Sequence, residues 1–276
     1  MSLLSLMRPP VNALDQEALD ELAEAIQQVD TDPATRVLII TSGINDIFCA
    51  GGDLKFWRGN QDAREVGGAG RKVFALIEQL SKPTIAAING YAFGDGLSLA
   101  LVCDLRFASE ASAFRLPEAG YGFIPGWGPI QRLVALVGRA HAAELLLMCE
   151  TIQAEQARMM GLINQTFPAD RLLEEALIRA KRIADLSPAA LHAAKCALSG
   201  EDEAACFEKV WGKADWREGI DALLAKRPPV FGSNENCMRP EKQRKSSEEY
   251  YDSIFDDAIF GSHGARFQAI ETYAGK

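Results

Sequence analysis

Two short glycine-containing segments have the residue types to hold a ligand through the main chain. The first, FCAGGDL, spans residues 48–54, and the second, GYAFGDG, spans residues 90–96. Glycine lets a ligand approach main-chain N–H groups closely, and the second segment opens an apolar run with helical character. Two such turns could direct a pair of N–H donors at one ligand atom. Taken singly, each turn is more simply explained by the tight geometry of a strand-to-helix connection.

Neither turn matches a nucleotide-binding pattern. The phosphate loop GxxxxGK[ST] is missing from the sequence, and the glycines at 94 and 96 lack the spacing of a dinucleotide fingerprint.

Strands and helices that would position these turns are predicted from the apolar pattern. Residues 37–40 and 84–88 read as buried strands, and a helix is expected between them at 71–80. Residues 94–103 leave almost no polar face and predict a buried helix, after which 105–108 resumes an extended pattern. Strand, helix and strand in this order indicate a crossover connection in an α/β fold.

The two ends of the chain differ from this central part. Apolar residues recur at helical spacing from Leu14 to Val29, with Asn12 or Asp15 as the N-cap. From about residue 131 onward the periodicity is helical, with segments expected at 142–149, 154–160, 170–186, 188–198 and 214–226. Residues 233–249 are rich in polar and charged side chains and read as a linker. The aromatic-containing end, 250–276, could dock on its own body or on a neighbouring subunit.

Composition limits the classes of function. The 276-residue chain is 48% hydrophobic and 24% charged and carries a net charge of −9, which favours one main domain and argues against nucleic acid or an anionic membrane as a partner. The first seven residues contain no basic residue, and no apolar run reaches the roughly 18 residues of a membrane span. The scattered cysteines lack CxxC spacing. A cytoplasmic location is expected.

The two turns, in this order, resemble the signature segments of the enoyl-CoA hydratase/isomerase, or crotonase, superfamily. These segments are FCAGGDLKFW at 48–57 and INGYAFGDGLSLALVCDLRFA at 88–108. The resemblance runs from about Arg8 to Phe231 and includes RLPEAGYGFIPGWGPIQRLVALVG, AEQARMMGLINQTFP and WREGIDALLAKRPPVF. It implies an α/β spiral of stacked ββα units in residues 1–232 with a helical C-terminal trimerisation region, while 233–276 is left as a linker and a tail of unknown role.

By position in this family, the main-chain N–H groups of Gly52 and Asp95 would form an oxyanion hole for an acyl-CoA thioester. Each such donor is typically worth about 10²- to 10³-fold in rate, because it stabilises the charge of the developing enolate. Glu118 matches the position of a catalytic glutamate, and partial desolvation there would raise its pKa. On local sequence alone, an acid after proline is more often a cap or turn residue.

Three departures from the family pattern bear on the reaction. Ser98 replaces the second glutamate that hydratases use, and could be either a neutral helix residue or a substrate or water contact. Asp95 stands where the family commonly has glycine, so its carboxylate is expected to point away from the enolate. Almost no strand sequence is expected ahead of Arg8.

Further residues are assigned to substrate binding by the same resemblance. Arg8 and Lys55 would lie along the CoA path, although both could be ordinary surface cations, and Trp57 and Trp127 could line an acyl pocket or simply belong to the core. The residues expected to contact the acyl-CoA are Arg8, Ala50, Gly51, Asp53, Leu54, Lys55, Trp57, Gly94 and Trp127. No metal ligand and no resident cofactor are expected, since coenzyme A enters with the substrate. Asp104 is interpreted as structural.

The sequence therefore predicts an acyl-CoA enzyme, with double-bond isomerisation by the single base Glu118 as the preferred reaction. Hydration, or hydration coupled to cleavage of an aromatic or branched acyl-CoA, is the alternative enzyme reading. A non-catalytic acyl-CoA-binding protein is the alternative from another class. A homo-oligomer, a trimer or a hexamer, is expected from the family.

Overall fold

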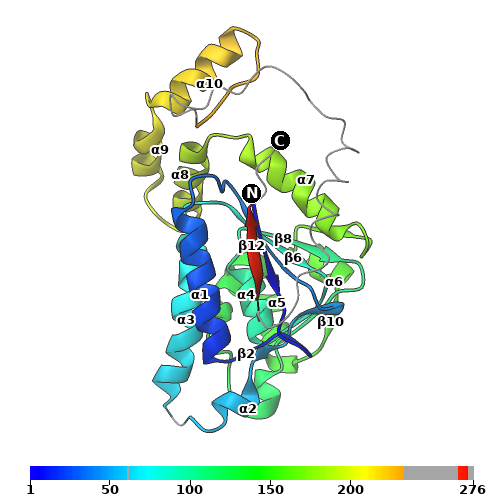
Figure 1. The fold of residues 1–276 in the computed structure, drawn as a ribbon. Coiled ribbons are helices and arrows are strands. Elements are labelled where there is room, and N and C mark those ends of the chain that lie inside the picture. The colour runs from blue at the N-terminus through cyan, green and yellow to red at the C-terminus, as the bar shows by residue number, and fades with distance from the viewer. Residues whose placement is uncertain (61, 233–266, 273–276) are drawn as a thin grey trace.

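The computed structural model describes residues 1–60, 62–232 and 267–272, and a six-stranded sheet runs through its centre (Figure 1). The strand order is β11-β8-β6-β3-β1-β12. All neighbouring pairs are parallel except β1 and β12, which are antiparallel. The strands are β1 Ser2–Leu6, β3 Leu38–Ser42, β6 Thr84–Ile88, β8 Leu105–Ser109, β11 Gln165–Phe167 and β12 Phe267–Thr272.

A second, four-stranded sheet of order β10-β9-β7-β4 contains the strands that lead into the two glycine turns. Its strands are β4 Asp46–Cys49, β7 Gly90–Phe93, β9 Ala113–Arg115 and β10 Ile152–Gln153. The pairs β3–β4, β6–β7 and β8–β9 each place one strand in the first sheet and the next in the second, and helices follow each pair. The chain therefore repeats a ββα unit, and the expected stacked architecture is confirmed.

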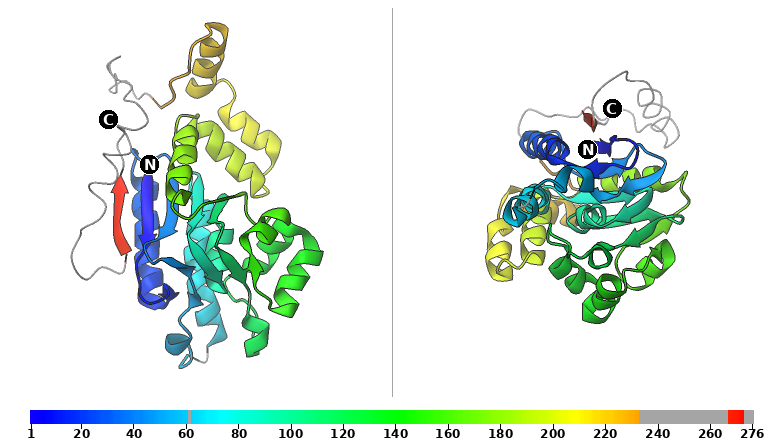
Figure 2. Two further views of the ribbon diagram at one scale, coloured as in Figure 1. Left: turned by 90° about the vertical axis from the view of Figure 1, so that its right-hand side faces the viewer. Right: turned by 90° about the horizontal axis from the view of Figure 1, so that it is seen from below.

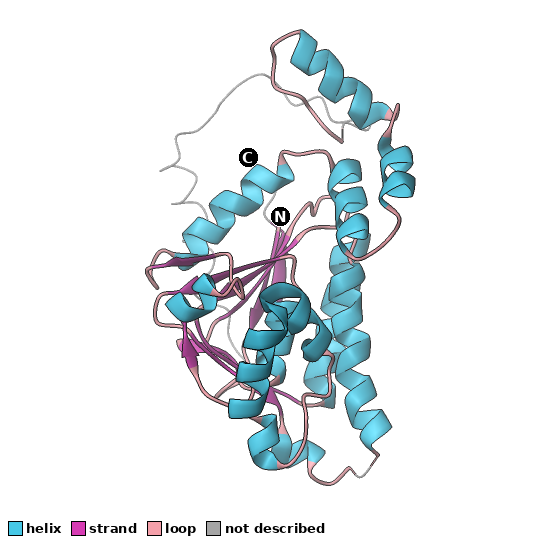
Figure 3. Ribbon diagram, turned by 180° about the vertical axis from the view of Figure 1, so that it is seen from behind, coloured by secondary structure: helices cyan, strands magenta, loops and turns pink. Residues whose placement is uncertain are grey.

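Helices cover both sheets (Figures 2 and 3). They are α1 Gln16–Thr31, α2 Leu54–Trp57, α3 Ala63–Gln79, α4 Asp95–Leu101, the 3-10 helix η1 Glu118–Tyr121, α5 Pro129–Met148, α6 Ala154–Met159, α7 Leu172–Ala184, α8 Pro188–Leu198, α9 Glu203–Val210 and α10 Ala214–Leu224. Figure 1 shows α1 beside α3 along one flank, and α9 and α10 at the far end of the molecule. No helix in the described residues is long and apolar enough to cross a bilayer.

The alternation of side chains along the central strands divides the core into two clusters. Leu38 and Ile40 of β3 face the larger cluster, which lies beneath α1 and α3. Val37 and Ile39 face the opposite side, where they pack with Leu177 of α7. Because both faces of the sheet are covered, the strand reads as a continuous apolar run rather than an alternating one.

The structure corrects expectations at the level of single elements, and the helix expected at 142–149 is the second half of α5, which begins at Pro129. Residues 2–6 do form a strand, β1, which pairs with β3, so the start of the chain contributes to the sheet. The helix expected at 71–80 begins at Ala63, because the Asp62 carboxylate caps it. Helix α9 was not predicted.

Other expectations are met or concern residues outside the described part of the chain. Asp15, of the two predicted candidates, caps α1. The linker 233–249 lies outside the described residues, whereas 267–272 of the tail form β12 on the chain's own sheet.

Candidate active site

The first turn contains a two-residue strand, β5 Gly51–Gly52, paired with β2 Ala13–Leu14. The Asp53 N–H donates to the Leu14 carbonyl oxygen at 2.8 Å. Neighbouring residues of a strand direct their N–H groups to opposite sides, so the Gly52 N–H faces away from β2. Gly51 has a φ of 95°, and a Cβ atom there would lie 2.8 Å from the main-chain nitrogen of Asp95. Glycine at 51 thus lets the two turns touch.

The second turn places a free N–H donor at the start of α4. Gly94, with a φ of 52°, precedes the helix, and its carbonyl oxygen accepts hydrogen bonds from the N–H groups of Leu97 and Ser98 at 3.0 and 3.1 Å. Asp95 is the first residue of the helix, where an N–H has no acceptor within the helix and lies at its positive end. Its N–H can therefore bind an external anion.

Glu118 lies against this second turn. Its side chain is buried, with the residue only 4% exposed, and a Cβ atom added to Gly94 would lie 2.8 Å from Glu118 Oε1. Oε2 is buried and has no hydrogen-bond partner among the described residues. Burial raises the pKa of this carboxyl group. Leaving such an atom unpaired costs about 1–3 kcal/mol, so the arrangement is typical of a functional site rather than of a structural cap.

The Asp95 carboxylate does not point away from the site, and that expectation was wrong. Its Oδ1 accepts a hydrogen bond from the Ser98 hydroxyl at 3.2 Å, and the carboxylate also accepts one from the Trp127 main-chain N–H. Its Oδ2 would lie 3.6 Å from a Cβ atom at Gly52. Burial, and next the negative charge of Glu118, raise the pKa of Asp95 to about 7. A carboxyl group with a pKa of about 7 populates both its protonated and its ionised form near neutral pH, so it can accept or release a proton there.

Ser98 has a defined partner in this arrangement. It is buried on α4, and its hydroxyl lies 3.4 Å from the Gly94 carbonyl oxygen as well as 3.2 Å from Asp95 Oδ1. Ser98 thus connects the turn to the Asp95 carboxylate.

Arg8 is held by the chain itself. Its guanidinium forms ion pairs with Asp15 and, at 3.1 Å, with Asp53, and donates to the Ala13 carbonyl oxygen at 2.6 Å. A phosphate bound by Arg8 would therefore compete with two carboxylates. Lys55 is exposed, as is its neighbour Leu54.

Trp57 and Trp127 are buried side by side, edge to face, with ring centroids 6.2 Å apart. The indole N–H of Trp57 donates to the Leu14 carbonyl oxygen at 3.0 Å, and that of Trp127 to the Val66 carbonyl oxygen at 2.9 Å. Both rings would come within 3.6 Å of a Cβ atom at Gly52. They belong to the core and form a wall behind the first turn. Ala50, by contrast, is exposed.

Two residues support the site from outside it. The Asp104 carboxylate accepts hydrogen bonds from the Thr84 N–H at 2.7 Å and from Lys195 Nζ at 2.9 Å, which confirms its structural interpretation. Asn12, predicted only as a possible cap, donates to the Phe48 carbonyl oxygen at 2.9 Å and thereby fixes the strand that enters the first turn. A buried asparagine before a strand offered no signal of that long-range contact.

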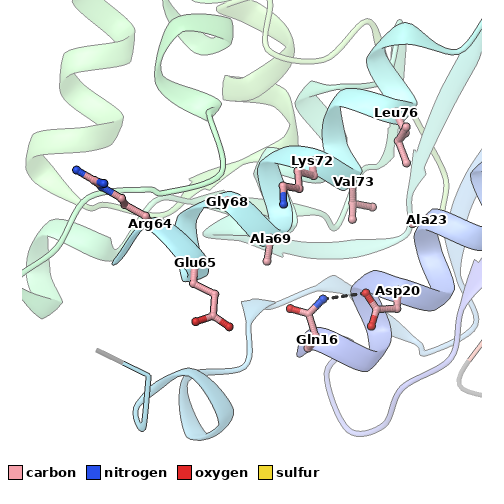
Figure 4. Close-up of a pocket in the computed structure, with 10 residues that line it drawn as sticks. All are labelled: Gln16, Asp20, Ala23, Arg64, Glu65, Gly68, Ala69, Lys72, Val73 and Leu76. Carbon is pink, nitrogen blue, oxygen red and sulfur yellow. Dashed lines mark hydrogen bonds between the residues drawn. The ribbon is translucent and has the colours of Figure 1, made fainter. Parts of the chain in front are cut away.

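One hollow lies away from these residues, between α1 and α3 (Figure 4). Its volume is about 420 Å³, and it is lined by Gln16, Asp20, Ala23, Arg64, Glu65, Gly68, Ala69, Lys72, Val73 and Leu76. Both acidic and basic side chains line it, and none of the predicted site residues is among them. It gives no chemical reason to move the site away from Glu118.

Comparisons with protein families, protein sequences and solved structures all find enoyl-CoA hydratases or their family. A profile described as enoyl-CoA hydratase/isomerase matches residues 1–234. The chain is 38% identical over 244 residues to a crotonyl-CoA hydratase of Syntrophomonas wolfei, covering 84% of this chain and 94% of that protein. It is 39% identical over 240 residues to a 2,3-dehydroadipyl-CoA hydratase of Escherichia coli, covering 83% and 94%. The crystal structure of an enoyl-CoA hydratase from Bacillus anthracis superposes with a TM-score of 0.77 at 34% identity, covering 83% of this chain and 98% of that one.

Proposed function

The chain belongs to the enoyl-CoA hydratase/isomerase family, and we propose that it catalyses the addition of water to a 2-enoyl-CoA. The N–H groups of Gly52 and Asp95 bind the thioester oxygen and stabilise the enolate, and Glu118 transfers the proton at C2. No metal or resident cofactor is required, because main-chain donors perform the electrostatic part of the reaction and coenzyme A arrives with the substrate.

The observation that carries the proposal is the state of Glu118. A carboxyl group with a raised pKa and an unpartnered Oε2 lies against the turn that presents the Asp95 N–H. A structural glutamate would have its oxygens paired with protein donors. A proton-transfer group must leave an oxygen available for substrate or water.

Hydration is favoured over other outcomes of the enolate by two supporting points. The relatives described above are named as hydratases. In addition, the Asp95 carboxylate provides a second acidic group near Glu118, so the serine at 98 does not leave the site with one carboxylate alone.

The test is the conversion of crotonyl-CoA in isotopically labelled water. The wild type is expected to yield 3-hydroxybutyryl-CoA whose hydroxyl oxygen comes from the solvent, and Glu118→Gln to reduce the rate by about 10²- to 10⁴-fold. Tight binding of the thioester with no turnover would instead select a non-catalytic acyl-CoA-binding protein. Unchanged turnover in Glu118→Gln would remove Glu118 from the mechanism.

Double-bond isomerisation is the second candidate, favoured by Ser98 at the place of a second glutamate. A single base could move a proton between C2 and C4 with the same oxyanion hole. Conversion of a 3-enoyl-CoA to a 2-enoyl-CoA, faster than hydration of the product, would select this reaction.

We further propose that the enzyme is a homo-oligomer that forms through its helical end and that it acts in the cytoplasm. Large apolar side chains are exposed along α8 to α10, which supports a contact between copies: Leu198, Phe207, Trp211, Leu223 and Leu224.

A further inference from the structure

We propose that the side chain of Asp95 is a second proton-transfer group, which binds and deprotonates the attacking water while Glu118 transfers the proton at C2. This inference rests on the proposed hydration. It gives Asp95 two separate functions, since its main-chain N–H binds the thioester oxygen and its carboxylate binds the attacking water.

The position of the carboxylate follows from contacts on three sides. The Ser98 hydroxyl donates to Oδ1 at 3.2 Å, and the Trp127 main-chain N–H donates to the same carboxylate. Oδ2 faces the first turn, 3.6 Å from where a Cβ of Gly52 would lie. Donors from α4 and from the segment before α5 thus hold the group in the region that the proposed oxyanion hole also occupies.

A second observation at the site points to a ligand between the two acids. Glu118 is buried, its Oε1 lies against Gly94, the residue that precedes Asp95, and its Oε2 has no partner in the described part of the chain. The negative charge of Glu118 also raises the pKa of Asp95, which agrees with their proximity. A water molecule bound between them would satisfy Oε2 and would be polarised by both carboxyl groups.

The proton balance of hydration suits such a pair. Two close, buried carboxyl groups share one proton rather than both ionising. The ionised Asp95 takes a proton from water as the water oxygen bonds to C3, the electron pair of the double bond moves toward the thioester oxygen, and the protonated Glu118 delivers its proton to C2. Transfer of the proton from Asp95 back to Glu118 through water restores the starting state.

Asp95→Asn separates the two functions of this residue, because it keeps the main-chain N–H and the side-chain size while removing proton transfer. Two rates are measured for each variant, the hydration of crotonyl-CoA and the exchange of the C2 protons of butyryl-CoA in deuterated water. Hydration is expected to fall at least about 100-fold, and exchange less than about tenfold. Glu118→Gln is expected to lower both. Asp170→Asn, which changes an exposed aspartate, is the matched control.

A rescue experiment covers the possibility that Asp95→Asn perturbs the turn. Asp95→Gly should lose hydration, and adding Ser98→Glu should recover at least about tenfold of it, since the carboxylate then returns to the same region from the next turn of α4. Circular dichroism and thermal unfolding identify any variant that fails to fold.

Two results would overturn the inference while leaving the proposed function intact. One is an Asp95→Asn variant that hydrates crotonyl-CoA at the wild-type rate. The other is an Asp95→Asn variant whose hydration rate and C2-proton exchange rate fall equally, which would mean that the substitution acts only through the oxyanion hole. A wild type that exchanges C2 protons but never hydrates would instead overturn the proposed hydration and the role of Asp95 together.

Discussion

The Ser98 hydroxyl donates a hydrogen bond to Oδ1 of Asp95 across 3.2 Å, within the first turn of α4. The residue at the place of the second glutamate therefore orients a different acid, the one at the start of the same helix. This hydrogen bond changes the interpretation of Ser98. The serine holds the carboxylate of Asp95 in place, so its presence does not leave the site with Glu118 as a lone acid.

Removing the Ser98 hydroxyl should change the pH dependence of hydration. Its hydrogen bond lowers the pKa of Asp95, against the larger raising effects of burial and of Glu118. In Ser98→Ala the ionised form loses a donor, so the limb of the kcat/KM profile that reports Asp95 should move to higher pH. Ser199→Ala, at an exposed serine, should leave the profile in place. A profile unchanged in Ser98→Ala would contradict the assignment.

Asp95 should also make the stability of the protein depend on pH. Folding raises the pKa of Asp95 from 3.8 to about 7, so the folded state holds the Asp95 proton more tightly than the unfolded state does. The contribution of this proton to the free energy of unfolding is fully present below about pH 4 and is lost as the pH rises toward 7. Relative to wild type, Asp95→Asn should gain free energy of unfolding across this window, by up to about 4 kcal/mol, and the difference should level off above it. Urea unfolding from pH 5 to pH 8 measures this. A constant difference would show that Asp95 ionises freely.

The wall behind the first turn can be tested with a pair of glycines in α3. A Cβ atom at Gly70 would lie 2.0 Å from Cδ2 of Trp127, so Gly70→Ala must displace the ring whose main chain also donates to Asp95. We expect a loss of about 1–3 kcal/mol in stability together with slower hydration. A Cβ at Gly68 meets no atom of the described residues within 4 Å, and Gly68→Ala should be neutral or stabilising by up to about 1 kcal/mol. Equal effects of the two substitutions would rule out the packing argument.

Asp104→Ala should destabilise the fold without acting on the chemistry. It removes the acceptor of the Thr84 N–H and leaves Lys195, whose side chain is 9% exposed, without its carboxylate. Loss of one partner of a buried ion pair costs about 3 kcal/mol or more. Chemical denaturation should show this loss, while kcat of the folded enzyme stays the same. A large fall in kcat at full folding would be the contrary result.

The proposed oligomer predicts that one charged substitution on α10 dissociates it. Leu224 is 77% exposed, and Leu224→Glu would place an unpaired charge in an apolar contact between copies. Light scattering coupled to size-exclusion chromatography should show a multimer for the wild type and monomers for Leu224→Glu. The control Gln27→Glu, at an exposed position on α1, should remain a multimer. A wild type that is monomeric at all concentrations would rule out the proposed contact between copies.

Strands of the central sheet could be predicted because both of their faces are buried. Residues 37–40 and, after Thr84, residues 85–88 are apolar without interruption, and the two predicted strands match β3 and β6 closely. Strand β1 was missed because its sequence, SLLSL, is short and is interrupted by serine, without the strict alternation of a half-buried strand. Its assignment depends on pairing with β3, a contact that no local pattern encodes.

Part of the candidate site was predicted from residue types and motif order, and the rest depends on tertiary contacts. The turns at Gly51 and Gly94 and the acid at Glu118 were found from motif order, and the structure brings Glu118 against Gly94. The direction of the Asp95 carboxylate could not be read from the sequence. Besides the Ser98 hydroxyl, a main-chain donor of Trp127 holds the carboxylate, and that residue lies 32 positions further along the chain. Such a donor carries no side-chain signature.

The exchange of the C2 protons of butyryl-CoA in deuterated water tests the central claim most directly, because this saturated thioester can form the enolate but cannot be hydrated. We expect the wild type to exchange these protons and Glu118→Gln to do so at least about 100-fold more slowly, with binding of the thioester little changed. Exchange that continues undiminished in Glu118→Gln would contradict the account.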